Sequence, residues 1–339
     1  MPIIPIFVSS SNERTLGRHK HRIRITKNVK PQGYKRRHTD PETLPFNEVL
    51  YADDTILLQH KAKQLEEQLA LLEIEAAKYG LKFNKKKCEH IRINAQTHVH
   101  FRDNEAVPRT SKAKYLGVIL EEHANPNTEI DERIKQATST WNRLYKYWKL
   151  GNCSKKKKLQ VWNAVIKTKL TYCLVTVQIN KDRASRLDAF QLKGIRRILN
   201  WKTTYIERRN TNKRLRQEAN KIINQGKTEA EGRDQFEELT KRLKRDRIKY
   251  LGHLLREDKR EPTRRATFNP NNTPNLGYKK RPGRPRNNLI TETTEEAWKS
   301  HRKQLPYGQR KHKSKKRKFN LKDPRVIKGL WIGAELRIY

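Results

Sequence analysis

Two adjacent carboxylates, Asp53 and Asp54, lie between two apolar runs in the segment NEVLYADDTILLQ. Neighbouring side chains of a strand point to opposite faces, so both anions cannot enter one core without a large desolvation cost. At the tip of a turn they can converge on a divalent cation, and Mg²⁺ prefers a few carboxylates supplemented by water and phosphate oxygens. Two such ions activate an attacking hydroxyl and stabilise a departing pyrophosphate in nucleotidyl transfer. The alternative is an ordinary turn, in which Asp is frequent.

The elements around the pair predict a mixed α+β layer. Apolar residues on both sides of the aspartates indicate a short hairpin with the carboxylates at its turn. From Lys61 to Lys78 the apolar residues are spaced by four and three, which predicts an amphipathic helix that ends at Gly80. Short strands are predicted at 81–83, 90–93 and 98–101, and most clearly at YLGVIL, 115–120.

Residues 127–256 show the same spacing of three and four and are predicted to be helical throughout. We expect Trp141, Trp148 and Trp162 to be packing anchors of this region, while its outward faces carry Lys and Arg. Beyond 257 the chain is rich in Pro, Asn, Gly and basic residues, and we expect little order there apart from a short helix near Glu295–Trp298.

Composition indicates a polyanionic partner. The chain has 78 Lys and Arg against 36 Asp and Glu, for a net charge of +42, and such self-repulsion destabilises an isolated compact protein. Nucleic acid is the first candidate. The three cysteines have no CxxC spacing, so neither a disulfide framework nor a zinc site is indicated. No membrane span or secretory leader is evident, so we expect an intracellular protein without a membrane partner.

Several motifs occur in an order that resembles one protein family. Tyr51-Ala52-Asp53-Asp54 is similar to the YADD box of reverse transcriptases of non-LTR, LINE-like retrotransposons. Residues 80–87, GLKFNKKK, fit the family's G-L-x-x-N-x-x-K segment, and 115–117, YLG, match its primer-grip hairpin. Farther on, 248–256 resemble a GH-containing element and 281–286 a GRPR stretch, so the resemblance extends over about 45–290.

The resemblance implies a role for each matching residue. Asp53 and Asp54 would bind Mg²⁺, although weakly in the form seen here, and Lys87 would act on the leaving pyrophosphate, where a cation must stand near developing phosphate charge. The primer-binding residues would be Tyr51, Ala52, Tyr115, Leu116 and Gly117. A nucleic-acid-binding stretch of the tail would comprise Arg281, Gly283, Arg284, Pro285 and Arg286, for which a solvated linker is the equal alternative.

The expected fold class is therefore α+β, with a partial polymerase palm followed by an all-α thumb and a disordered basic tail. The palm part would hold the YADD hairpin, a helix and a small antiparallel sheet. The domains would be a basic flexible lead-in at 1–44, the palm with the primer-grip hairpin at 45–122, the thumb and connection at 127–256, and the low-order tail at 257–339.

The expected function is that of a retrotransposon-derived reverse transcriptase fragment acting on an RNA template and a DNA primer. Only some fifty residues precede the hairpin, and the fingers and the upstream palm aspartate of the family have no counterpart there, so we expect no activity from the chain alone. Whether it is an enzyme is left open. The alternative is a non-catalytic, sequence-tolerant nucleic-acid-binding protein. The basic run Arg310–Lys318 fits either a nuclear localisation signal or a phosphate-binding arm, and the oligomeric state is open.

Overall fold

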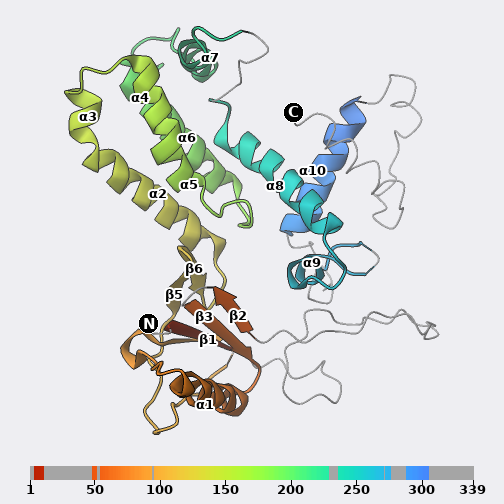
Figure 1. The fold of residues 1–339 in the computed structure, drawn as a ribbon. Coiled ribbons are helices and arrows are strands. Elements are labelled where there is room, and N and C mark those ends of the chain that lie inside the picture. Colours follow the sequence, from red (N-terminus) through yellow and green to blue (C-terminus); the bar gives the residue numbers. More distant parts are fainter. Residues whose placement is uncertain are drawn as a thin grey trace. The chain divides into compact units, whose positions relative to one another are not determined.

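The computed structural model describes residues 4–10, 48–51, 54–93, 95–228, 236–270, 272–275 and 288–304. The chain divides into a sheet unit, 1–125 with 254–285, and a helical unit, 126–253 with 286–339. The ribbon in Figure 1 shows the strands of the first unit and the helices of the second. Three parts of the predicted sites lie outside the described residues: Ala52 with Asp53, the stretch 281–286, and the run 310–318.

A four-stranded sheet of order β2-β3-β1-β4 forms the centre of the sheet unit. Strands β2 (Glu48–Tyr51) and β3 (Asp54–Gln59) pair antiparallel with Tyr51 opposite Asp54, which confirms the predicted hairpin. Strand β4 (Glu89–Ile93) confirms the strand predicted at 90–93. Asp54 is thus the first residue of β3, and its partner across the hairpin is the last residue of β2.

Strand β1 (Ile4–Ser10) was not predicted from the sequence. It lies between β3 and β4 and runs parallel to both, so this sheet is mixed. The predicted antiparallel pairing holds for β2 with β3 and for the separate two-stranded sheet within residues 112–121. Residues 4–10 also belong to this sheet rather than to a flexible lead-in. Pro5 explains the omission, because proline has no N–H group to donate and is uncommon inside a central strand.

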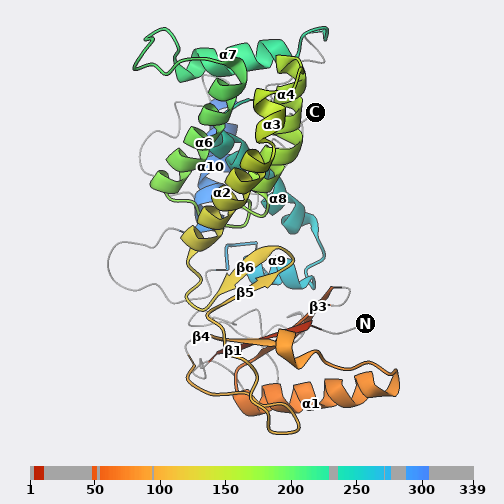
Figure 2. The same cartoon turned by 90° about the vertical axis from the view of Figure 1, so that its left-hand side faces the viewer.

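Helix α1 (Ala62–Lys78) confirms the predicted helix and packs on one face of the sheet, as Figure 2 shows. Its Leu65 and Leu69 are fully buried in a cluster with Leu57 of β3. The helix ends in a Schellman motif: the N–H of Gly80 donates to the Ala77 carbonyl, and the N–H of the next residue donates to the Ala76 carbonyl. Gly80 has a φ of 71°, which glycine adopts without steric cost.

Three of the predicted strands differ from the structure. Residues 81–83 and 98–101 form no strand, and in the second segment only His100 makes a bridge, to Ala106. The backbone of 98–101 instead belongs to a loop that closes on itself, in which the N–H of Val107 donates to the Val99 carbonyl. The segment 115–120 is not one strand, because it turns back on itself between β5 (Lys112–Tyr115) and β6 (Val118–Glu121).

The helical unit confirms the predicted helical character of 127–256 but divides it differently. The first helix breaks at Leu144, and a π-helical turn, η2, interrupts the next helix. Residues 212–223 are helical as predicted, but their short apolar stripe is diluted by charged residues and did not mark α7 as a separate helix. The elements are α2 (Pro126–Arg143), α3 (Tyr145–Lys149), α4 (Lys155–Val161), η2 (Trp162–Lys167), α5 (Thr168–Thr171), α6 (Lys181–Leu199), α7 (Asn212–Ile223) and α8 (Leu239–Arg256).

The tryptophans are core residues of the helical unit, as predicted. Trp162 is fully buried and its ring centroid lies 5.8 Å from that of Phe236. Trp141 is nearly buried and stacks on Trp148 at 4.5 Å. Gly194 of α6 permits this packing, because a Cβ atom there would stand 2.5 Å from Nε1 of Trp162. The indole rings therefore pack the helices together.

Two further helices lie in the region that the sequence predicted to be a low-order tail. Helix α9 (Pro262–Thr267) belongs to the sheet unit and α10 (Leu289–Gln304) to the helical unit. Helix α10 extends the short helix predicted near Glu295–Trp298. Its Glu292 accepts a hydrogen bond from Gln178 at 2.6 Å, so a long-range contact supports it. Among the described helices, none is both long and apolar enough to cross a membrane.

Candidate active site and nucleic-acid interface

Tyr51 and Asp54 pair with each other in the β2–β3 hairpin but differ in their exposure to solvent. Tyr51, at the end of β2, is 62% exposed, whereas Asp54, opposite it at the start of β3, is half-buried. Alternation along a strand places Asp54 on the same sheet face as Ile56. Asp54 therefore lies at the edge of the buried cluster on that face and is partly exposed to solvent.

The β5–β6 hairpin covers that same face of the sheet, opposite α1 (Figure 2). Tyr115 and Ala113 of β5 form a buried cluster with Ile56 of β3 and Ile91 of β4. The two sequence-predicted motifs, YADD and YLG, are sixty residues apart but are brought together by this cluster. The structure thus unites Asp54 and Tyr115 on one side of one sheet.

Tyr115 has an unusual environment for a phenol. The side chain is only 9% exposed, and its hydroxyl makes no hydrogen bond to any described residue. Burial raises its pKa, and the negative charge of Asp54 raises it further. Tyr115 therefore keeps its proton at neutral pH and offers a donor beside the carboxylate.

The turn between β5 and β6 holds a leucine in a strained backbone conformation. Leu116 has a φ of 47° and Gly117 a φ of 80°, the two positive values of a type I′ hairpin turn. Glycine adopts this conformation freely, whereas a leucine there costs on the order of 1 kcal/mol. An asparagine would relieve that cost, because it tolerates positive φ better than leucine does.

Among the described residues, the lysines of the segment 80–87 form no ion pair with Asp54. Lys87 lies in a single 3₁₀ turn, is exposed, and pairs with no carboxylate of the described residues. Lys85 instead forms salt bridges with Asp103 and Glu105. The hydrogen bonds to these two carboxylates raise the pKa of Lys85, and the bond to Asp103 has the larger effect. The proposed pyrophosphate role of Lys87 thus gains no support from a contact in the structure, and the role of Lys85 is structural.

Cys88 follows these lysines and is a core thiol. It is fully buried beside Leu65 and Leu69, and its Sγ donates to the Asn84 carbonyl at 3.3 Å. Burial and the nearby charge of Glu73 raise the pKa of Cys88 to about 12. The thiol is therefore unreactive while the sheet unit is folded.

Helix α2 carries a polar stripe that sequence reasoning did not single out. Five exposed residues at spacings of three and four line one shallow hollow on the helix. The opposite side of α2 packs into the core through Ile130, Ala137 and Trp141. Cations, hydroxyls and amides along one face are the groups that contact nucleic-acid phosphates. The five are Lys135, Thr138, Ser139, Asn142 and Arg143.

The described residues contain no group of three His, Cys, Asp or Glu side chains that could hold a metal. Strand β1, the neighbour of β3, places Ile4 opposite Asp54, and its sequence IPIFVSS has no carboxylate. Among the described residues of β1 and of the β2–β3 hairpin near the predicted site, Asp54 is the aspartate that the structure places. Two carboxylates suit Mg²⁺ provided that water and phosphate oxygens complete the coordination.

One protein family matches the part of the chain that contains the YADD and YLG motifs. The family described as reverse transcriptase (RNA-dependent DNA polymerase) matches residues 18–120, which include the β2–β3 and most of the β5–β6 hairpin. No curated protein and no solved structure matches the chain. The match confirms the reverse transcriptase part of the resemblance seen in the sequence.

Proposed function

Residues 18–120 carry a reverse transcriptase domain match, and from this premise we propose that they are palm sequence of a LINE-like, non-LTR retrotransposon reverse transcriptase. The observation that carries the proposal is the packing of the YLG hairpin on the Asp54 face of the YADD hairpin, through Tyr115 and Ile56. In this reading Asp53 and Asp54 hold Mg²⁺, which neutralises charge on the reacting phosphates. Tyr51, Ala52, Tyr115, Leu116 and Gly117 hold the primer end.

The helical unit would serve as the thumb, which binds the primer–template duplex through phosphates. Its polar α2 stripe supports this role, because Lys135 and Arg143 stand at the two ends of a row of hydroxyl and amide groups. The high net charge of +42 supports a polyanionic ligand as well. Contacts of this type position a duplex without reading its sequence.

We propose further that the chain alone does not extend a primer. Nucleotidyl transfer by two metals needs more carboxylate ligands than the aspartate pair, and β1 brings none to the strand beside Asp54. The test is primer extension on an RNA template by the full chain with Mg²⁺ or Mn²⁺. The expected result is no product above background, and extension that Asp53→Ala abolishes would overturn this part of the proposal.

A second candidate is a nucleic-acid-binding protein without catalysis, which the α2 stripe favours independently of the hairpin. Binding of a duplex by the full chain should weaken with salt, with log K falling by about 0.9 per log unit of salt for each phosphate neutralised. Lys135→Ala should lower that slope by about 1, whereas Asp53→Ala should leave affinity unchanged. A slope near zero would contradict both candidates, and metal-dependent binding that Asp53→Ala removes would favour the polymerase over the second.

A further inference from the structure

The loop between α6 and α7 presents a side chain that the proposed polymerase role does not use. Residues 202–209 are exposed without interruption, between the half-buried Trp201 and the buried Asn210. At the centre of this loop Tyr205 is 97% exposed and Ile206 is 67% exposed. An aromatic and an aliphatic residue side by side in water form a small apolar tip on an otherwise charged surface.

The loop is closed across its own base by one buried amide. The Asn210 side chain donates from Nδ2 to the Lys202 carbonyl at 3.1 Å and to the Glu207 carboxylate at 3.0 Å. Within the loop the N–H groups of Ile206 and Glu207 both donate to the Thr203 carbonyl. These bonds hold the backbone on both sides of Tyr205, so the ring is presented from a formed loop.

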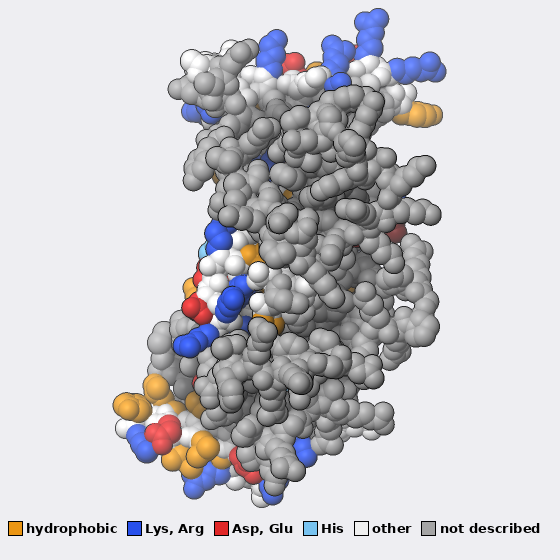
Figure 3. Space-filling model, turned by 90° about the vertical axis from the view of Figure 1, so that its right-hand side faces the viewer, with side chains coloured by type: hydrophobic (Ala, Val, Ile, Leu, Met, Phe, Trp, Pro, Cys, Tyr) orange, Lys and Arg blue, Asp and Glu red, His pale blue; other side chains and the backbone are white. Residues whose placement is uncertain are grey.

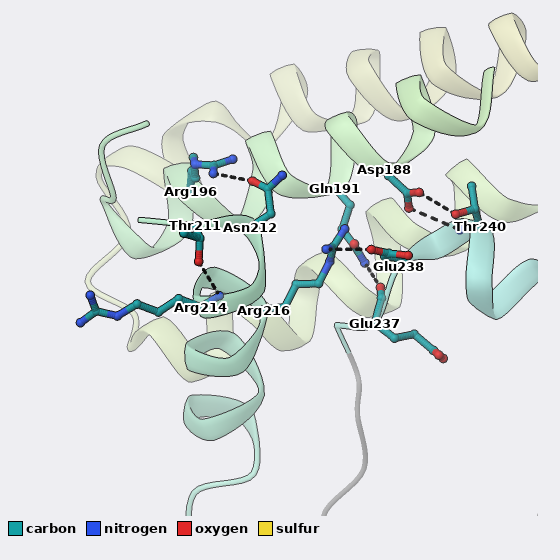
Figure 4. A network of polar contacts seen from close by, with 10 residues as sticks. All are labelled: Asp188, Gln191, Arg196, Thr211, Asn212, Arg214, Arg216, Glu237, Glu238 and Thr240. Atoms are coloured by element: carbon teal, nitrogen blue, oxygen red, sulfur yellow. Dashed lines mark hydrogen bonds and ion pairs between the residues drawn. The ribbon is translucent and has the colours of Figure 1, made fainter. Parts of the chain in front are cut away.

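The ends of the loop are attached to the two helices. Arg196 of α6 donates to the Asn210 carbonyl at 3.3 Å and to Oδ1 of Asn212 at 2.7 Å. Figure 4 shows Arg196 turned toward Asn212 at the start of α7. The guanidinium of Arg214 lies 5.7 Å from the Trp201 ring centroid, and Trp201 packs against the core of the unit. The base of the loop is thus part of the folded unit, and only its tip is exposed.

Positive charge surrounds this tip. Lys202, Arg208 and Arg209 are exposed, and Arg208 and Arg209 form no ion pair with a described residue. The single acid of the loop, Glu207, is already engaged by Asn210. Lys and Arg side chains also gather at the top of the view in Figure 3, at the height where Figure 1 labels α7. An anionic partner is therefore favoured at this surface.

We propose that Tyr205 stacks on an unpaired base of a single-stranded nucleic acid, while Arg208 and Arg209 neutralise the flanking phosphates. The inference rests on the proposed nucleic-acid function and adds a base-contacting site to it. Aromatic rings bind single strands in this way because every base has a π-face, which makes the contact tolerant of sequence. A formed loop loses little conformational freedom on binding, which strengthens such a contact.

The test measures binding of the full chain to an unstructured single-stranded DNA, and to an RNA of the same sequence, by fluorescence anisotropy. Tyr205→Ala should raise Kd about 10-fold, the effect typical of losing one base–aromatic stack, and Tyr205→Phe should bind like the wild type. Tyr205→Leu should bind as weakly as Tyr205→Ala, because leucine is apolar but cannot stack. Tyr79→Ala is the matched control, since Tyr79 is 81% exposed on the sheet unit and should have no effect.

Three outcomes would overturn the inference, and they are distinguishable. A wild-type chain that binds neither strand would refute the proposed nucleic-acid function together with the inference. Wild-type binding that Tyr205→Ala leaves unchanged would refute the stacking site alone. Retention of affinity by Tyr205→Leu would mean that the tip makes a simple apolar contact, as in docking to a protein surface.

Discussion

The hydrophobic cores of the two units of this chain are very different. The helical unit has one continuous core of leucine, isoleucine and tryptophan side chains, which includes the fully buried Trp162 and Phe236. In the sheet unit the buried residues form two small clusters on opposite faces of the sheet. The Asp54 side is covered by the smaller of these, so the candidate catalytic hairpin has the thinner support.

This difference is measurable because each unit has its own natural reporter. All six tryptophans of the sequence fall within the residue ranges of the helical unit. The buried thiol of Cys88 belongs to the sheet unit and becomes reactive only when that unit opens. Tryptophan fluorescence and mass-spectrometric labelling of Cys88 can therefore follow the two cores separately in urea.

The largest expected effect comes from Trp162→Ala. Removing this fully buried indole leaves a cavity beside Phe236 and Gly194, and should lower the free energy of unfolding of the helical unit by about 3–5 kcal/mol. The measurement is the urea midpoint of tryptophan fluorescence, followed through the remaining indoles. Labelling of Cys88 should stay at the wild-type rate.

Leu57→Ala is the matched change in the sheet unit, because Leu57 is equally buried in the cluster that holds Cys88. It should speed Cys88 labelling at low urea and leave the fluorescence midpoint in place. If either substitution moves both signals together, the two cores unfold as one cooperative unit and the comparison fails.

The next effect is a pH dependence confined to the sheet unit. His90 of β4 is buried, and burial first, then the charge of Arg92, lower its pKa to about 4. In the unfolded chain the pKa of this histidine is near 6.5. The free energy of unfolding of the sheet unit is therefore at its full value above about pH 6.5, and it falls by about 3 kcal/mol as the pH drops to about 4.

Hydrogen exchange of peptides from β3 to β4, corrected for the intrinsic effect of pH, measures this loss. His90→Gln should remove the pH dependence between those values, even if the variant is less stable at every pH. An unchanged pH slope in His90→Gln would assign the effect to other groups.

The smallest effect concerns the strained turn of the β5–β6 hairpin. Asn tolerates positive φ better than Leu, so Leu116→Asn should stabilise the sheet unit by about 0.5–1 kcal/mol. Gly117→Ala is the opposite control and should cost about 1 kcal/mol. Slower Cys88 labelling of Leu116→Asn in urea measures the gain in stability. Weaker primer–template binding by Leu116→Asn would show that Leu116 contacts the nucleic acid. A destabilised Leu116→Asn would contradict the strain.

Much of the fold could be predicted because it depends on local patterns. Helix α1 and its end at Gly80 follow from spacing by three and four and from a glycine that accepts positive φ. The YADD hairpin follows from apolar runs on both sides of turn residues. The break at Leu144 and the π-helical turn could not be predicted, because the apolar period continues through both and only packing decides where a helix bends.

The candidate site divides in the same way. The sequence by itself determined which residues can do chemistry, since Asp53, Asp54, the YLG motif and the excess of cations are chemical identities and short spacings. The tertiary structure alone decided that Tyr115 packs on Ile56, two residues from Asp54, that the acid-free strand β1 lies next to β3, and that Tyr205 stands on a formed loop. These arrangements join residues far apart in the chain, and their free energy depends on which surfaces are buried together rather than on any local pattern.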